Sequence, residues 1–391
     1  MKSRRCPCVA FAALVLAFPF TAPLGAESLA PFTLPSLRST ATGGLHAAPA
    51  DDFFAIFDNP AGFAGQEGEL SAALLNLHLG GPVFDMAGLG LGFFAGAPFD
   101  LSTALSGLLD ANGRLYAVLD IGGPVAFGWV GQGLGFGVFD RTTLLLNVAG
   151  VSSASAALTQ EFLLTGGYAF RIPLGGTHYL DLGLQPKGFI RGALDVSGSL
   201  PAVAGALADP AALMGSQPFT LSTGIGLDAG FIYSWKGAGL AFGFAARDAW
   251  SPARMALYPS MEAFLAGSAP ASSAIALVEP DLSVDLAWDP RFAFLERLDL
   301  SPRFVVGYKD LLGLLDPLPR NPVLQVGAGF ELVILDILSL RAGIADALPN
   351  AGFAVDLSAF RFGLSMYGTE LGLDPGVRPL YNLLLSFEFR Y

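Results

Sequence analysis

The sequence predicts an all-β protein, a transmembrane antiparallel β-barrel of about 14 strands, and three observations support this fold class. The chain is 53% hydrophobic but only 14% charged, well below the roughly 25% typical of globular domains. After residue 26 the sequence has no uninterrupted run of about 18 apolar residues, which a spanning helix needs. Its segments instead alternate apolar and polar residues. Only helices and closed barrels satisfy all backbone polar groups within lipid, so the alternation favours a barrel.

The N-terminus has the layout of a secretory signal peptide over residues 1–26. A basic start from Lys2 to Arg5 precedes an apolar run from Val9 to Phe20, and small residues end the segment at Ala26. Cleavage after Ala22 is an alternative, as is an uncleaved membrane anchor, although the run is short for a spanning helix. With the signal removed, the chain is expected to be exported to the outer membrane.

Loss of the signal peptide changes the chemistry available to the chain. Cys6 and Cys8 leave with it, so we expect no disulfide, no thiol nucleophile and no cysteine metal site. Three of the 21 basic residues leave too, so 18 remain against 33 acidic residues, a formal charge of −15. Such an acidic chain is not expected to bind nucleic acid. We expect no cofactor.

The strand count follows from length. The 365 residues after residue 26, at about 26 residues for each strand with its connection, give about 14 strands. The first strand is expected to begin near Glu69, which places the barrel at residues 68–391.

The last eleven residues, Tyr381 to Tyr391, form the clearest strand. Every odd position is apolar or aromatic, while the even positions include Glu388 and Arg390. Successive strand side chains point to opposite faces, so this strand separates an oily phase from a polar one. A closing strand that ends on an aromatic, Tyr391, is common in outer-membrane barrels and predicts a contact with the barrel-assembly machinery.

Other segments repeat the pattern. From Asp181 to Val196 the even positions are apolar, and the odd positions carry four charges: Asp181, Lys187, Arg191 and Asp195. From Leu221 the odd positions are mostly apolar and end on Trp235, where an interfacial aromatic girdle is expected. A soluble β-sandwich is the alternative, but its outward face would be polar rather than aromatic.

Several connections are too long for simple turns. Residues 98–114 have the pattern of a short amphipathic loop helix, and a second is expected at residues 309–315. Residues 200–218 and 252–280 are long, apolar and rich in Ala, Pro and Ser. Because loops of this length are usually functional, we expect them to cover or gate one end of the barrel.

A dense motif lies near the mature N-terminus, between Thr42 and Ala64. It combines Gly43-Gly44, the acid pair Asp51-Asp52 and the turn Asn59-Pro60-Ala61-Gly62. The glycines permit positive φ, Pro60 biases Asn59 toward extended backbone, and Asp51 and Asp52 can cap a helical turn around residues 53–57. Pro49 argues against a continuous helix between the glycines and the acids.

This segment resembles the N-terminus of the FadL family of long-chain fatty-acid transporters and their PorV-like relatives. The direct match covers about 25 residues, with the barrel pattern supporting the rest. The resemblance implies that residues 27–67 form a hatch inside the lumen. It assigns the hatch or gate role to the following residues: Gly43, Gly44, Asp51, Asp52, Phe57, Asn59, Pro60 and Ala61.

Catalysis is not expected. None of the three histidines, His46, His78 and His178, lies in a recognisable nucleophile motif. Asp51-Asp52 alone cannot form a cation cage, so we expect no metal site.

The resemblance implies transport of long-chain fatty acids or other hydrophobic compounds through a hatch-gated barrel in outer-membrane lipid. Lys187 and Arg191 are candidates for contact with a ligand carboxylate, although acids on the same strand face could neutralise them. One alternative is a PorV-like shuttle or assembly protein that binds protein cargo or a secretion apparatus. Another is a surface adhesin or structural barrel.

Overall fold

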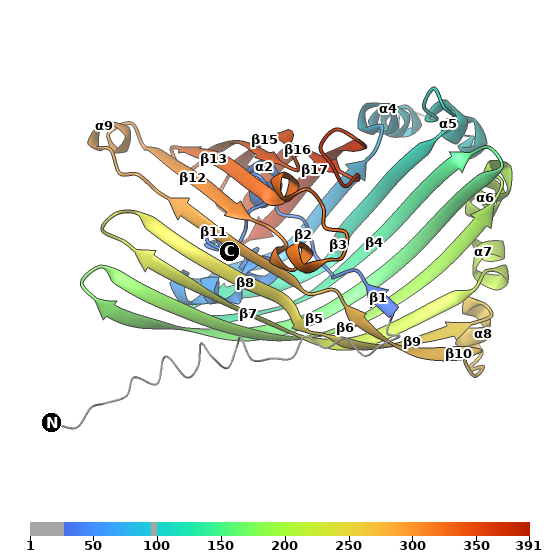
Figure 1. Cartoon of the computed structure of the whole chain (residues 1–391), viewed down its shortest axis with the longest axis horizontal. Coiled ribbons are helices and arrows are strands. Elements are labelled where there is room, and N and C mark those ends of the chain that lie inside the picture. Colours follow the sequence, from blue (N-terminus) through green and yellow to red (C-terminus); the bar gives the residue numbers. More distant parts are fainter. Residues whose placement is uncertain (1–26, 95–99) are drawn as a thin grey trace.

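The computed structural model describes residues 27–94 and 100–391, so the expected signal peptide lies outside the described residues. One continuous sheet curls round on itself and closes where its last strand pairs antiparallel with its first long strand (Figure 1). The wall is an antiparallel barrel of 14 strand positions, because β8 and β9 continue one another, as do β10 and β11. The predicted fold class is therefore confirmed.

The strands that form the wall have the following bounds: β2 (Glu69–Gly80), β3 (Leu115–Gly131), β4 (Leu134–Gly150), β5 (Ser153–Gly175), β6 (His178–Gly198), β7 (Phe219–Trp235), β8 (Leu240–Trp250), β9 (Pro252–Tyr258), β10 (Ser272–Val278), β11 (Asp281–Trp288), β12 (Leu300–Tyr308), β13 (Val326–Ile334), β14 (Leu338–Ala345), β15 (Leu348–Asp356), β16 (Phe360–Glu370) and β17 (Pro379–Arg390). The remaining strand, β1 (Glu27–Leu29), is the only parallel one among the described residues and lies outside this series.

The helices are short and have these bounds: α2 (Leu37–Ala41), α3 (Ala55–Asp58), η1 (Pro60–Gly65), α4 (Val83–Phe94), α5 (Leu101–Gly107), α6 (Leu200–Ala208), α7 (Pro210–Ser216), α8 (Met261–Leu265), α9 (Ala293–Glu296), η2 (Leu311–Leu315) and η3 (Pro322–Gln325). Within the described residues, no helix is long and apolar enough to cross a membrane.

The alternation predicted for β17 places its two faces as expected. Tyr381, Phe389 and Tyr391 are 41%, 54% and 81% exposed on the outside, whereas Ser386 and Glu388 are buried inside. The same division holds around the wall, where the exposed large side chains are mostly aliphatic or aromatic. An apolar outer belt is the surface that a bilayer would cover.

The barrel is taller on one side. Strands β3 to β7 are 17 to 23 residues long, whereas β12 to β17 have only 8 to 12. At about 3.3 Å per residue this difference is some tens of ångströms along the strand. Figure 1 shows the long strands sweeping past the short ones to the end that carries α4 to α8.

The long connections differ in part from expectation. Residues 200–218 form α6 and α7, but they do not cover the barrel mouth. Their Leu200 and Val203 pack against Leu194 and Val196, which lie on the same outward face of β6 as the exposed Ile190. The outward face of the long strands stays apolar beyond the outer belt, and these helices cover it there.

The interpretation of residues 252–280 as a loop is wrong. The two ends of this stretch form β9 and β10, which pair with each other from Leu257 to Pro252. Residues 98–114 include the short helix α5, although residues 95–99 lie outside the described part. The expected loop helix at residues 309–315 is present as η2.

Candidate functional site

Most of the N-terminal segment, residues 27–67, occupies the interior of the barrel, and its first residues pair with wall strand β10. Helix η1 contacts β3 to β7 on the tall side, whereas α2 contacts β14 to β17 on the opposite side. Nearly all residues from 45 to 63 are buried. A segment that touches both sides of the wall in this way occludes the lumen.

Gly43 and Gly44 let this segment approach the wall closely. Their φ angles are 88° and 74°, the positive values that the sequence predicts. A Cβ on Gly43 would lie 2.8 Å from the carbonyl oxygen of Ala328 and 2.9 Å from that of Ile344. Because such contacts cannot relax, glycine is required here on both steric and conformational grounds.

Asn59 links the segment to itself and to the wall. Its side chain is fully buried. The Oδ1 atom accepts from the backbone N–H of Ala61 at 3.0 Å, and Nδ2 donates to the carbonyl oxygens of Ala47 at 2.7 Å and Phe244 at 3.2 Å. Asn59 itself is extended, as Pro60 predicts, with φ −155° and ψ 113°.

An aromatic cluster fills the bore beneath this turn. The ring centroids of Phe57 and Phe139 lie 4.7 Å apart, and those of Phe53 and Phe139 lie 6.0 Å apart. Phe53 and Phe63 are fully buried. Since Phe139 belongs to β4 and the others to the N-terminal segment, hydrophobic contact joins the occluding segment to the tall wall.

On the side of the short strands, ion pairs attach the N-terminal segment to the wall. Arg38 of α2 pairs with Asp51, with Asp52 at 3.2 Å and with Glu331 of β13 at 3.3 Å. Arg303 of β12 reaches Asp51 at 2.7 Å. Two wall strands are thereby connected to the segment through charged side chains.

The acid pair divides into two roles. Burial disfavours the charged form of Asp51, but Arg303 and Arg38 outweigh it and hold the pKa of Asp51 below its ordinary range. Asp52 instead accepts from the Phe54 N–H at 3.0 Å, in the turn before α3 and not as the predicted helix cap, and burial raises its pKa. Of the two acids, Asp51 is therefore the stronger anion.

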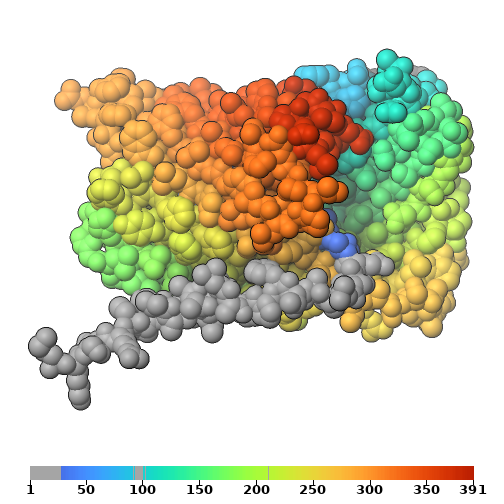
Figure 2. Space-filling model, viewed as in Figure 1, coloured from blue at the N-terminus to red at the C-terminus, as the bar shows by residue number. Residues whose placement is uncertain are grey.

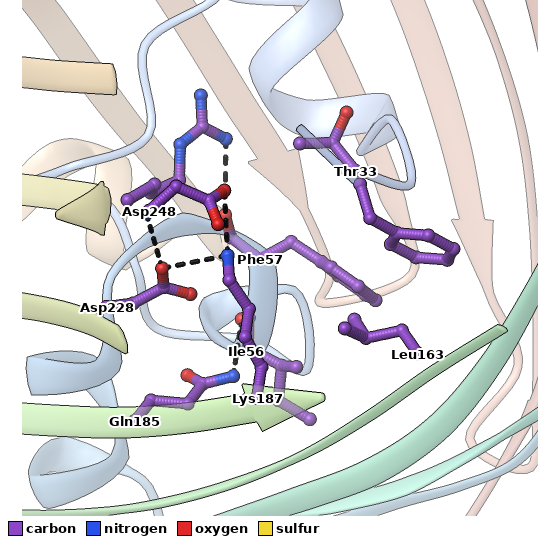
Figure 3. Close-up of a pocket in the computed structure, with 10 residues that line it drawn as sticks. Thr33, Ile56, Phe57, Leu163, Gln185, Lys187, Asp228 and Asp248 are labelled. Carbon is purple, nitrogen blue, oxygen red and sulfur yellow. Dashed lines mark hydrogen bonds and ion pairs between the residues drawn. The ribbon is translucent and has the colours of Figure 1, made fainter. Parts of the chain in front are cut away.

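The two candidate head-group cations already have partners in the structure. Lys187 Nζ lies 2.8 Å from Asp228 and 2.9 Å from Asp248, and Figure 3 shows it between the two carboxylates. Arg191 pairs with Glu161. The neutralising acids therefore lie on β5, β7 and β8, and not on β6 as the sequence suggested.

The space beside Lys187 is small. A cavity of about 10 Å³ lies among Ile56, Phe57, Gln185 and Lys187 (Figure 3). This volume is at the limit for one water molecule. A ligand can enter the lumen at this level only if the N-terminal segment moves.

Sequence reasoning missed Arg38, Arg303 and Glu331. Their inward direction could have been found from strand alternation, at least for Arg303 and Glu331, which face each other in register on β12 and β13. Nothing in the sequence indicated a role for Arg38, because it lies before the motif between residues 42 and 64.

The other side chains with possible chemistry have structural surroundings. His46 Nε2 lies 3.2 Å from Ser283 Oγ, and His78 Nδ1 lies 2.7 Å from Asp120. His178 Nδ1 lies 2.8 Å from the hydroxyl of Tyr233. Among the described residues, no group of three or more His, Cys, Asp or Glu side chains is arranged to hold a metal ion.

The closed ladder, the apolar outer belt and the occluded lumen define a class of protein: a membrane-type β-barrel filled by its own N-terminal segment. No family model matches the sequence, and no curated protein matches it.

Three solved structures are similar to the chain. The toluene transporter TbuX of Ralstonia pickettii is 13% identical, with a TM-score of 0.47, over 94% of this chain and 100% of that one. The toluene transporter TodX of Pseudomonas putida is 12% identical, with a TM-score of 0.45, over 91% of this chain and 98% of that one. A FadL homologue of Pseudomonas aeruginosa is 11% identical, with a TM-score of 0.28, over 93% of this chain and 99% of that one.

Proposed function

We propose that the protein transports hydrophobic compounds, including long-chain fatty acids, across the outer membrane, and that residues 27–67 are the hatch that gates its barrel. The observation that carries the proposal is the occluding segment itself. It is joined to the tall wall by aromatic contact and to the short wall by ion pairs such as Arg303–Asp51. Such a segment closes the lumen yet can be displaced without breaking the barrel ladder.

Three further features support this reading. The outer belt suits a bilayer, the motif between residues 42 and 64 resembles the FadL family, and the similar structures include two toluene transporters. The loops of the short wall also expose apolar side chains, with Leu315 and Leu318 about 80% exposed. Exposed apolar loops are suited to collecting an oily ligand before it enters.

The test is uptake of radiolabelled decanoate and oleate by cells whose own uptake is absent. We expect the full chain to restore uptake, and Asn59→Ala to change its rate because the hatch is loosened. If neither ligand enters, and the purified barrel carries a stoichiometric protein instead, the transport proposal fails. That result would favour the shuttle that binds protein cargo.

A further inference from the structure

The two ends of the barrel differ in their connections. At the end opposite α4 to α8, the turns after β3, β5, β7, β13 and β15 have two to four residues. Outer-membrane barrels have short periplasmic turns and longer extracellular loops, so this end is the periplasmic one. The connection between β11 and β12 departs from this rule, because residues 289–299 form an eleven-residue loop that includes α9 (Figure 1). A connection of this length is more than two neighbouring strands need.

The periplasmic turns of the two walls also differ in composition. On the tall wall they are polar or rich in glycine: Gln132-Gly133, Gly176-Thr177 and residues 236–239. On the short wall the turns carry six large apolar side chains, each between 44% and 63% exposed: Phe292, Phe294, Leu298, Leu335, Ile337 and Leu357. These six residues form the periplasmic apolar rim. Figure 2 shows the α9 loop, which holds three of them, as a projection at the upper left.

Backbone hydrogen bonds place the turns of the rim side by side. The Leu335 N–H donates to the Asp299 carbonyl oxygen at 2.9 Å, which joins the second turn to the α9 loop. The Asp356 N–H donates to the Ile337 carbonyl oxygen at 2.7 Å, which joins the third turn to the second. The exposed apolar side chains therefore follow one another along the end of the short wall and are not scattered singly.

The rim continues the apolar outer belt. Trp288, the last residue of β11, is 42% exposed on the outer face and stacks on Phe304 of β12, with ring centroids 5.7 Å apart. The α9 loop follows Trp288 directly, and the rings of Phe292 and Phe294 in this loop stack at 6.2 Å. The apolar surface that a bilayer would cover thus extends past the ends of β11 and β12.

The short wall needs such an extension to match a bilayer. Strands β12 to β15 have only eight or nine residues, at or below the lower limit of about nine to eleven for a transmembrane strand. At about 3.3 Å per residue and a tilt of about 45°, nine residues cover roughly 21 Å of membrane thickness, against an apolar band of about 25 Å. The remaining few ångströms fall on the connections at the ends of these strands, where apolar side chains are favoured in lipid.

Two arginines suit the α9 loop to a layer of phospholipid head groups. Arg291 and Arg297 flank α9 and are exposed, and neither forms a hydrogen bond or an ion pair with any described residue. A guanidinium group can bind a phosphate through two parallel hydrogen bonds. Glu296 and Asp299 are exposed in the same loop and balance the two positive charges. The loop therefore offers phosphate contacts without a net positive charge, which fits a zwitterionic phospholipid as well as an anionic one.

We propose that the periplasmic apolar rim inserts into the inner leaflet of the outer membrane, with the α9 loop as its anchor. Phe292 and Phe294 lie at the depth of the first acyl carbons, and Arg291 and Arg297 contact the lipid phosphates. The occupant is lipid and not protein, because the rim continues the belt without a break and lies where the short strands end within the apolar band. The inference concerns how the barrel is seated in the membrane. It goes beyond the proposed function, since it holds whether or not the barrel carries a ligand.

Insertion is tested by spin labelling of the full chain in phosphatidylcholine liposomes. With Cys6 and Cys8 replaced by serine, Phe294→Cys is the only cysteine and carries one nitroxide label. Electron paramagnetic resonance then compares its collisions with oxygen, which is enriched in lipid, and with a water-soluble nickel chelate. We expect the label at 294 to favour oxygen, as a label at Ile190→Cys on the belt does. The label at Lys236→Cys, in an exposed turn of the tall wall, should favour the nickel chelate.

Two outcomes would overturn the proposal. A label at 294 that collides with the nickel chelate as often as the label at 236 would place the α9 loop in water. A label at 294 that is shielded from both reagents would mean that a second copy of the chain, and not lipid, covers the rim.

The anchoring role of the two phenylalanines is tested with the label at Leu298→Cys. Adding Phe292→Ser and Phe294→Ser should raise its collisions with the nickel chelate severalfold, because the loop loses its apolar contact with lipid. Leu314→Ser with Leu315→Ser, a pair of exposed leucines at the extracellular end, is the matched control and should leave the label unchanged. All four side chains are exposed, and the heat-modifiable band shift checks that each barrel is folded. Equal collisions with and without the two phenylalanines overturn the anchoring role.

The phosphate contacts are tested by adding Arg291→Gln and Arg297→Gln to the same labelled protein. We expect a smaller rise in nickel collisions than with the serine pair, because the rings stay in lipid while the loop loses its head-group contacts. The label should be equally deep in phosphatidylcholine alone and with added phosphatidylglycerol. Insertion that requires phosphatidylglycerol would overturn the assignment to a zwitterionic surface, and an unchanged label in the glutamine pair would overturn the phosphate contacts.

Discussion

Arg303 Nη2 donates to Asp51 Oδ2 across 2.7 Å and so ties wall strand β12 to the N-terminal segment. Arg303 also binds Asp289 at 2.6 Å, while Asp51 is shared with Arg38. The pair therefore belongs to a chain of alternating charges that runs from the wall into the segment. The guanidinium groups of Arg38 and Arg303 are largely buried while Asp51 is half exposed, so loss of the Asp51 charge leaves two buried cations with one carboxylate fewer.

Asp51→Asn is expected to open the barrel to ions more often. The amide cannot balance two guanidinium groups, so the short-wall attachment of the segment weakens while the aromatic contacts remain. Single-channel recording in planar bilayers should show openings severalfold more frequent than in wild type. Asp195→Asn, on the lumen side of β6 away from the segment, is the control. Equal closure of Asp51→Asn and wild type would mean that the ion pairs do not hold the segment.

Asn59→Ala is expected to loosen the segment further. It removes four hydrogen bonds, one accepted from Ala61 and three donated to the carbonyl oxygens of Ala47, Phe231 and Phe244. At about 1 kcal/mol for each of the three shorter bonds, the cost is about 3 kcal/mol. Amide hydrogen exchange of residues 53–63 should accelerate about a hundredfold if it follows local opening. Asn147→Ala, an exposed position on β4, should leave that exchange unchanged, and unchanged exchange in Asn59→Ala would contradict the assigned role.

The sequence predicts the alternation and much of the motif because both are local. Period-two spacing predicts which side chains of β17 lie on the outer face and which on the inner face, and the extended backbone of Asn59 follows from the proline after it. The positive φ angles of Gly43 and Gly44 likewise follow from residue type, because glycine adopts such angles without steric cost. Local rules of this kind need no knowledge of which strands become neighbours.

The ionic partners could not be predicted because they depend on long-range register. Alternation places Lys187 on the lumen side, but its partners come from two later strands. Asp248 points inward only because the β7–β8 register shifts between Leu227 and Ala229, and the residue itself has φ 49°. A bulge of this kind has no sequence signal strong enough to locate it. The same limit hid β9 and β10, whose short pairing strands lie in an Ala- and Ser-rich stretch.

His46 is expected to make the docking of the N-terminal segment acid-sensitive. Burial, with Arg247 nearby, lowers its pKa to about 4, against about 6.5 when solvated. A lowered histidine pKa stabilises docking above pH 6.5, and this contribution of at most about 3 kcal/mol is lost as the pH falls toward 4. Asp52 and Asp58 act in the opposite sense, since their raised pKa values favour docking at low pH.

The contribution of His46 is isolated by comparing wild type with His46→Gln. Channel opening in wild type should rise between pH 6.5 and pH 4 more steeply than in the variant, which keeps a neutral hydrogen-bonding side chain. His178→Gln, at the rim of the barrel, should retain the wild-type profile. Identical profiles for wild type and His46→Gln would show that His46 stays neutral whether or not the segment is docked.

Lys187→Met separates a structural role from a ligand role. The substitution leaves Asp228 and Asp248, both about 95% buried or more, without their cation. Breaking a buried pair in this way costs about 3–5 kcal/mol. We therefore expect lower barrel stability, measured as the urea midpoint of the heat-modifiable band shift. Arg191→Met should cost less, because Glu161 keeps Arg141 at 2.8 Å.

Adding Asp228→Asn and Asp248→Asn to Lys187→Met should restore much of the stability, since the uncompensated charges are then gone. The same triple variant should bind decanoate as wild type does, because Lys187 already pairs with two carboxylates in the closed barrel. A stable Lys187→Met protein that has lost decanoate binding would contradict this structural role. It would mean that Lys187 leaves its two carboxylates and binds the ligand when the barrel opens.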